Sequence, residues 1–242
     1  MSLKRNLSIN GGGVVPFKAI DVRTNQIIYA WQVKVKRKFI CPYCRKSMIF
    51  VDSIKKRKHF RHKTSCDYYW ESETLEHEEM KYIVYSWLKE LFPDKVVDVE
   101  VKIGSYIADV VVKDEKRFYV FECQKENTNV DKILKKCMFY SWKGFPQIWI
   151  SFCDKKTLEK LWKNRPYFTL NNEWMRYIYY MSGQAVFLDT KTEKFGVYNL
   201  EKRISKTRFK VNNVSWQKVF NFTIYVNEDN GFILLKEKEK NI

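Results

Sequence analysis

The sequence predicts an α+β protein whose central part runs helix, three strands, helix, strand. Two observations predict this order. Apolar residues recur at helical spacing in two segments, and four short runs rich in Val, Ile, Phe and Tyr have the pattern of strands. The 242 residues are enough for one large or two small domains with a packed core. Hydrophobic residues make up 45% of the chain, which excludes an intrinsically disordered protein.

The first expected element is a β-hairpin over residues 17–36. "FKAIDV" and "QIIYAWQVKV" alternate in polarity, and "RTN" between them supplies turn residues. A strongly basic segment follows, since Lys34 to Lys63 contains twelve Lys or Arg and one acid, Asp52. We assign residues 1–70 to an N-terminal lobe made of this hairpin and the basic segment.

The central part begins with a helix whose first turns lie in the acidic run "ESETLEHEEM" and which ends before Pro93. A second helix covers "TNVDKILKKCMFYSWKG" and ends at Gly144. We assign residues 71–153 to this core. The expected strands are "VVDVEVKI" (96–103), "YIADVVV" (106–112), "RFYVFECQ" (117–124) and the buried "FPQIWISF" (145–152).

The remaining residues, 154–242, are assigned to a C-terminal α+β extension for substrate recognition or dimerisation. We expect short helices at 155–164 and 172–181, and hairpins at 185–200 and 220–235.

Cysteines and histidines gather in the basic segment. Cys41-Pro-Tyr-Cys44 is a C-x-x-C knuckle, a spacing at which two thiolates can bind one tetrahedral zinc ion. His59, His62 and Cys66 are candidates for the other two ligands. We favour His62 with Cys66, because His59 and His62 are three apart on an expected strand and tend to point to opposite faces.

Two alternatives to a zinc site remain open at this point. A redox C-x-x-C would require a thioredoxin-like βαβ context, which the pattern lacks. Small core cysteines are the other alternative, although the segment is basic and polar. We expect Cys123, Cys137 and Cys153, which lie in apolar elements, to be packing residues.

No run approaches the roughly 20 apolar residues that a membrane span needs. The N-terminal residues also lack the apolar core of a signal peptide. We therefore expect a cytoplasmic protein with no membrane partner, in which the six cysteines are ligands or core residues rather than disulfides.

Two carboxylates fall on neighbouring expected strands. Glu122 closes the apolar run "FYVFECQ", and Asp109 lies inside "YIADVVV", where Asp is disfavoured. Adjacent acids repel each other unless a cation lies between them, and Mg²⁺ or Mn²⁺ accepts such carboxylates. Gln124 lies two residues after Glu122, so it shares a face with it and can hold a water or a phosphate oxygen.

The helix before these strands carries Glu73, His77 and Lys81 at i, i+4 and i+8, on one face. We expect them to extend the metal shell or to place a phosphate. The alternative is an exposed acidic face that balances the basic segment. We accept that alternative for the other acids of this run, Glu71, Glu78 and Glu79.

The motifs together resemble the competence protein CoiA-like family of the PD-(D/E)XK nuclease superfamily. The resemblance covers about residues 17–152 and rests on "FICPYC", "HFRH", "ETLEH", Ala108-Asp109-Val110, "VFECQ" and "YSWKGFPQIWI". It implies a restriction-endonuclease-like αβββαβ core with a zinc-finger-like N-terminal lobe. Gln124 stands where the superfamily usually has Lys, so the handling of protons is left open.

The resemblance implies a nuclease that hydrolyses DNA with Mg²⁺ or Mn²⁺, in competence, recombination, repair or defence. Asp109, Glu122, the Cys123 carbonyl and Glu73 would hold the cation, with Gln124 and His77 completing the catalytic set. The alternatives are a non-catalytic, zinc-stabilised DNA-binding protein and an RNase of a toxin or defence system.

A formal net charge of +17 favours a nucleic-acid partner, DNA before RNA, and a homodimer is possible. Tyr140, Trp142 and Trp149 are candidates to stack on bases, with core packing favoured for Trp149. The residues expected to contact nucleic acid are Lys55, Lys56, Arg57, Lys58, His59, Arg61, Lys63, Lys81 and Tyr140.

Overall fold

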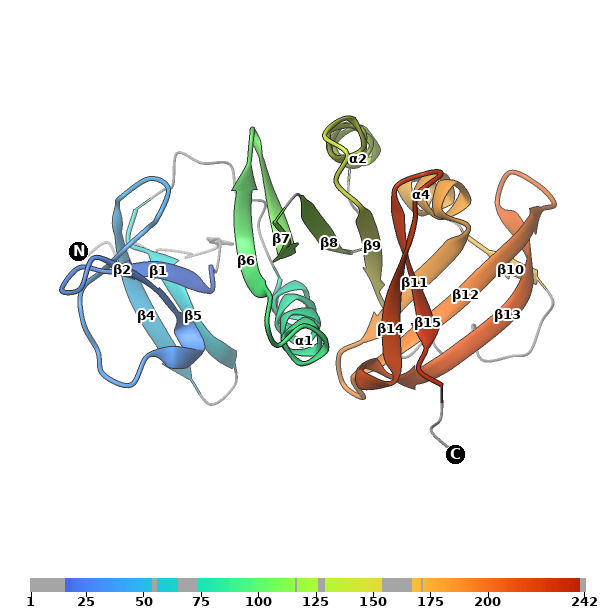
Figure 1. Cartoon of the computed structure of the whole chain (residues 1–242). Helices are drawn as coiled ribbons and strands as arrows, with labels where there is room; N and C mark the ends of the chain where they lie inside the picture. The colour runs from blue at the N-terminus through green and yellow to red at the C-terminus, as the bar shows by residue number, and fades with distance from the viewer. Residues whose placement is uncertain are drawn as a thin grey trace, which may run out of the picture. The chain divides into compact units, whose positions relative to one another are not determined.

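The computed structural model divides the chain into two compact units, residues 1–75 and 76–242. It contains mixed α and β structure dominated by strands (Figure 1). The residues that the structure describes are 16–53, 56–64, 74–115, 117–125, 129–153, 167–170 and 172–239.

The first unit contains a five-stranded antiparallel sheet in the order β2-β1-β3-β4-β5. Its core contains Phe39 and Phe60, whose ring centroids lie 4.9 Å apart. The predicted hairpin is present but shorter than expected, because the chain turns into a short 3-10 helix (η1, Ala30–Gln32) directly after β2. The strands are β1 (Lys18–Asp21), β2 (Gln26–Tyr29), β3 (Phe39–Ile40), β4 (Ser47–Ser53) and β5 (Lys56–His62).

The second unit begins with the expected order of helix, three strands, helix and strand. The side chain of Asn129 caps the second helix by accepting a hydrogen bond from the backbone N–H of Lys132. Gly104, at φ +60°, makes the turn between the first two strands. The elements are α1 (Leu75–Leu91), β6 (Val96–Ile103), β7 (Tyr106–Lys113), β8 (Phe118–Gln124), α2 (Val130–Trp142) and β9 (Gln147–Phe152).

The C-terminal part adds strands and one described helix to this arrangement. The helix expected at 172–181 and both expected hairpins, β11–β12 and β14–β15, are confirmed. The helix expected at 155–164 lies outside the described residues. The elements are β10 (Tyr167–Thr169), α4 (Glu173–Ser182), β11 (Gln184–Asp189), β12 (Lys194–Arg203), β13 (Arg208–Lys218), η2 (Val219–Asn221), β14 (Phe222–Asn227) and β15 (Phe232–Glu237).

All strands of the second unit belong to one ten-stranded sheet, in the order β10-β13-β12-β11-β9-β8-β7-β6, which β15 and β14 join at β9. The strands β8, β9 and β11 are parallel, and β6, β7 and β8 are antiparallel. The C-terminal strands therefore continue the sheet of the central part through β9. Residues 71–153 and 154–242 both contribute strands to this sheet. Their assignment to a core and an extension with separate roles stays a prediction.

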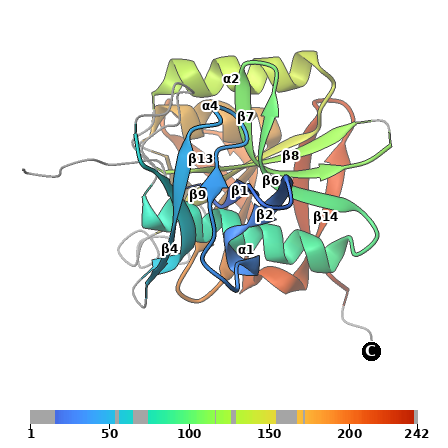
Figure 2. The same cartoon turned by 90° about the vertical axis from the view of Figure 1, so that its left-hand side faces the viewer.

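The helices α1 and α2 lie on opposite sides of the β6–β9 part of the sheet (Figures 1 and 2). Trp87 of α1 packs edge-on against Phe121 of β8, and Tyr140 of α2 contacts the next residue, Glu122. Consecutive strand residues point to opposite faces. The side chain of Phe121 therefore faces α1, and that of Glu122 faces α2.

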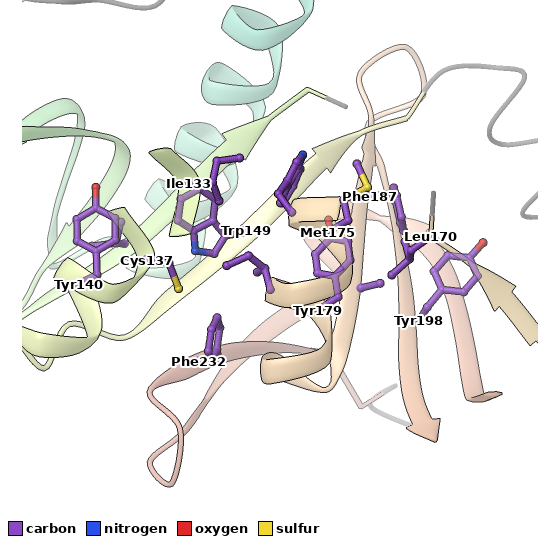
Figure 3. Packing of buried hydrophobic residues seen from close by; sticks show 14 of the residues in the cluster. Ile133, Cys137, Tyr140, Trp149, Leu170, Met175, Tyr179, Phe187, Tyr198 and Phe232 are labelled. Atoms are coloured by element: carbon purple, nitrogen blue, oxygen red, sulfur yellow. The ribbon is translucent and has the colours of Figure 1, made fainter. Parts of the chain in front are cut away.

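A large apolar cluster joins α2, α4 and the sheet (Figure 3). Trp149 of β9 is buried, as predicted, and its indole lies 6.3 Å from that of Trp174. The buried Cys137 and Cys153 belong to this cluster, and Cys123 is also buried, so all three act as packing residues. This core supports the strands that carry Asp109 and Glu122.

Candidate active site

Asp109 lies where β7 and β8 stop pairing. The described ladder between these strands ends at Val110 and Phe121. Beyond this point, the backbone N–H of Cys123 donates a hydrogen bond of 2.8 Å to Oδ2 of Asp109. The side chain of Asp109 thus takes the place of a strand partner, which explains how a buried Asp is accommodated in a strand interior.

His77, from the first turns of α1, contacts the same carboxylate. Its Nε2 lies 3.2 Å from Oδ2 of Asp109. Burial by itself raises the pKa of Asp109, but His77, Lys136 and Lys81 outweigh burial and hold this pKa well below its usual value. Asp109 is therefore an anion at neutral pH, the form that binds a cation.

Glu122 is fully buried and is held by two residues of α2. Nζ of Lys136 lies 2.7 Å from Oε2, and the hydroxyl of Tyr140 donates to Oε1 at 2.7 Å. Lys136 and Tyr140 are four residues apart, so one side of α2 presents both to the carboxylate.

The pKa of Glu122 is raised to about 8. Burial is the main cause, and the charge of Asp109 adds to it, while Lys136 and Tyr140 oppose it. The pKa of Asp109 is thus lowered, which favours its ionised form, and the pKa of Glu122 is raised, which favours its neutral form. A cation between them would stabilise both in the ionised form.

Gln124 and Cys123 complete the end of β8. Gln124 is nearly buried and lies two residues after Glu122, on the same side of the strand. Cys123 is buried. Glu73 lies outside the described residues, so its place in the metal shell stays a prediction.

The structure corrects the expected contacts of two residues near these carboxylates. Lys81 is fully buried and forms an ion pair of 2.8 Å with Glu100, so it does not reach a substrate. The ring of Tyr140 is also fully buried and its hydroxyl is used by Glu122, which excludes stacking on a base. Among the other aromatic candidates, Trp142 is 76% exposed, with Nζ of Lys143 4.4 Å from its ring centroid.

Glu78 corrects a third expectation. It was expected on a solvent-exposed acidic face of α1, yet it is buried. The acidic run is therefore not wholly a solvent-exposed face.

Two residues near Asp109 and Glu122 were missed by sequence reasoning, Lys136 and Glu100. The available signal for Lys136 was its i, i+4 spacing to Tyr140 within a predicted helix. Glu100 had no such signal, because its neighbours "VDVEVKI" alternate as in an ordinary strand with Glu on the solvent side.

A second group of candidate metal ligands lies in the N-terminal unit. The ligand atoms of Cys41, Cys44 and His62 all lie within 4.8 Å of one another. Sγ of Cys44 is 3.4 Å from Nε2 of His62. Arg45, at φ +61°, closes the tight turn of the knuckle, with its N–H donating to the Cys41 carbonyl at 3.1 Å.

The donors of this group fit a metal such as zinc. Burial, together with the charge of Lys46, lowers the pKa of His62 and favours the neutral imidazole, which is the form that binds a metal. Cys66, the expected fourth ligand, lies outside the described residues. His59 points elsewhere, with Nδ1 2.8 Å from the carbonyl of Arg57.

His59 is also 4% exposed, which corrects the expectation that it meets a phosphate. The other basic residues of β5 remain candidates. Arg61 and Lys63 are exposed, and the side chain of Lys58 is 42% exposed beside Asp52, with 3.1 Å between Nζ and Oδ2. Lys55 and the side chain of Lys56 lie outside the described part of the chain.

No helix in the described part of the chain has the length and apolar character needed to cross a bilayer.

Comparison with known proteins places the chain in a family. The family model described as "Competence protein CoiA, nuclease-like domain" matches residues 73–224, which is more than half of the chain. No curated protein and no solved structure matches. The match continues past residue 152, so the family's domain includes strands β11 to β13 of the C-terminal part.

Proposed function

Because this chain belongs to the CoiA nuclease-like family, we propose that it is a metal-dependent nuclease that hydrolyses phosphodiester bonds in DNA. The observation that carries the proposal is the pair of buried carboxylates, Asp109 and Glu122, each contacted by a basic side chain from a helix. Opposite pKa shifts of two neighbouring acids are typical of catalytic sites.

The proposed core is the restriction-endonuclease-like fold of the PD-(D/E)XK superfamily. In support, α1, β6, β7, β8, α2 and β9 follow one another in the αβββαβ order of that fold. The acids lie on adjacent strands, Asp109 on β7 and Glu122 near the end of β8.

We assign Asp109, Glu122, the Cys123 carbonyl and Glu73 to the binding of Mg²⁺ or Mn²⁺. Oxygen donors of this kind suit these hard cations. When bound, the cation supplies a polarised water and neutralises charge on the phosphate. Oδ2 of Asp109 contacts both Nε2 of His77 and the backbone N–H of Cys123, and we assign the orientation of this carboxylate to His77.

Lys136 supplies the positive charge that Gln124 cannot. The superfamily pattern places Lys two residues after the strand Glu, and Gln at this position has neither charge nor an exchangeable proton of suitable pKa. Lys136 brings an ammonium group to the same Glu from α2. We assign charge stabilisation at the phosphate to Lys136, placement of the water or phosphate to Gln124, and positioning of Glu122 to Tyr140.

The N-terminal unit is proposed to be a zinc-stabilised lobe that contacts the nucleic-acid backbone. Its support is the Cys41, Cys44 and His62 group next to the exposed basic residues of β5. Phosphate contacts by Lys and Arg provide affinity without sequence preference. We place the activity in DNA processing in the cytoplasm.

The test is cleavage of labelled single-stranded, double-stranded and branched DNA, and of RNA, with Mn²⁺, Mg²⁺ or EDTA. Asp109→Asn and Glu122→Gln are measured in parallel. Metal-dependent cutting of DNA that both variants lose supports the proposal. Cutting of RNA alone supports an RNase, and tight binding with no cutting by wild type supports a non-catalytic binder.

A further inference from the structure

A third buried carboxylate lies beside the proposed site and has no part in the reaction described above. Glu100 of β6 is 1% exposed, and its Oε1 lies 2.8 Å from Nζ of Lys81 on α1, which is 0% exposed. Burying both members of an ion pair is costly, and apolar residues of similar volume are often at least as stable. Stability alone therefore gives no reason for this pair.

The backbone of Glu100 is also unusual. Its φ of +52° is left-handed, a conformation that is unfavourable for residues with a Cβ atom. Val99 and Glu100 are both buried, so the alternation of strand β6 is interrupted here. The β6–β7 ladder skips Glu100 and Asp109 and pairs the residues on either side of them, Val99 with Val110 and Val101 with Ala108.

The register is the same on both sides of the gap, so Glu100 and Asp109 lie opposite each other without being paired. A left-handed backbone at a residue other than glycine is strained, and such strain clusters at functional sites. Here the side chain of Glu100 meets Lys81, one turn after His77 on the same side of α1. Glu100 thus contacts Lys81, and Lys81 lies on the same helix as His77. His77 in turn contacts the carboxylate of Asp109.

We propose that Lys81 and Glu100 are positioning residues of the nuclease site, which fix the first turns of α1 against β6 so that His77 meets Asp109. Neither side chain touches the substrate or the cation. Glu100 also neutralises Lys81, which leaves the carboxylate of Asp109 available to an incoming cation. This inference rests on the proposed function, because it assigns the pair to the same site.

The test compares wild type with the double variant Lys81→Met/Glu100→Leu, which removes one positive and one negative charge. The matched control is Lys95→Met/Asp114→Asn, which removes a surface ion pair of 2.9 Å between the residue before β6 and the residue after β7. For each protein we measure the thermal unfolding midpoint, the affinity for Mn²⁺ by titration calorimetry, and kcat and KM for DNA cleavage.

The expected result is a double variant that unfolds no earlier than wild type but binds Mn²⁺ and turns over DNA about tenfold less well, with KM unchanged. The control should match wild type in every measurement. A double variant with wild-type Mn²⁺ affinity and kcat overturns the positioning role while leaving the nuclease proposal intact. A wild-type protein that neither binds Mn²⁺ nor cuts DNA overturns both.

Glu100→Gln provides a second variant if the double variant does not fold. It keeps the size of the side chain and removes its charge, so the ion pair that fixes Lys81 to β6 is lost. We expect the same direction of change, a lower Mn²⁺ affinity and a lower kcat. Wild-type values in folded Glu100→Gln would also overturn the positioning role.

Discussion

The two candidate metal sites of this chain are built from opposite kinds of donor. Cys41, Cys44 and His62 offer sulfur and nitrogen, and Sγ of Cys44 lies 3.4 Å from Nε2 of His62. Asp109 and Glu122 offer oxygens that His77 and Lys136 already contact. The difference teaches that the first site gathers the donors that suit zinc, whereas basic side chains of the protein already contact the donors of the second.

Zinc removal should have the largest effect. Structural zinc contributes on the order of 10 kcal/mol to folding in small domains, because the site does not exist in the unfolded chain. We expect a chelator, or Cys44→Ser, to unfold the N-terminal unit while the second unit stays folded. Metal analysis and hydrogen exchange of the two units measure this, and an N-terminal unit that stays protected without zinc contradicts it.

A pair of histidine variants sharpens the zinc prediction. His62→Asn should lose zinc, since Nε2 of His62 lies among the ligand atoms. His59→Asn is the matched control and should keep zinc, because the ring of His59 contacts the carbonyl of Arg57 instead. The reverse result would assign the ligand to His59.

Removal of either active-site carboxylate should have the next largest effect. Asp109→Asn and Glu122→Gln should each reduce kcat for DNA cleavage on the order of 10³-fold, because they remove charge that stabilises the transition state. Circular dichroism should show both variants folded. If either variant cleaves DNA at the wild-type rate, its carboxylate has no part in the chemistry.

Lys136→Met should reduce kcat by about 10²-fold, a typical contribution of a charged group that assists proton transfer or stabilises charge. Lys135→Met is the control, since Lys135 is exposed on the same helix. Both variants lose one positive charge, so a general loss of DNA attraction should raise KM equally in the two. Equal kcat values in the two variants would remove Lys136 from the site.

The smallest expected effect is a pH dependence of the metal-free protein. With a pKa of about 8, folded Glu122 keeps its proton up to that pH, whereas the unfolded chain releases it near 4.5. The free energy of unfolding should therefore fall as pH rises from 4.5 to 8. Asp109 has a lowered pKa, so its ionised form stabilises the folded protein at higher pH. This contribution to the free energy of unfolding is lost as pH falls below 3.8.

Urea titrations in EDTA at pH 5 and pH 8 measure this dependence for wild type and Glu122→Gln. The decline should be smaller in the variant, because Gln does not titrate. Mn²⁺ should reduce the decline in wild type, since it favours the ionised carboxylate. An equal decline in wild type and variant would show that Glu122 titrates alike in the folded and unfolded states.

Much of the fold was accessible from local patterns. The helical spacing before Pro93, the hairpin turn at Gly104 and the Asn129 cap each act over a few residues, so the order of elements from α1 to β9 was predicted correctly. The hairpin at 17–36 was predicted too long, because its alternation continues in the sequence past the point where η1 begins. The pairing of β9 with β11 and β15 joins segments distant in sequence and had no local signal.

The sequence by itself determined which residue types are available for each candidate site. The Cys41 knuckle and His62 are joined by the β4–β5 hairpin, so their proximity follows from short-range structure. Asp109 and Glu122 come from strands joined by a short turn, which a pattern of hairpins also predicts.

Only the tertiary structure decided which cations meet these acids. Lys136 had no predicted role and Lys81 was expected to meet a phosphate. Packing of α2 and α1 on opposite faces of the sheet instead brings Lys136 to Glu122 and buries Lys81 against Glu100. The left-handed Glu100 has no local cause in its sequence. Burial and charge pairing depend on what the whole chain places around a side chain, and strand periodicity carries no information about that.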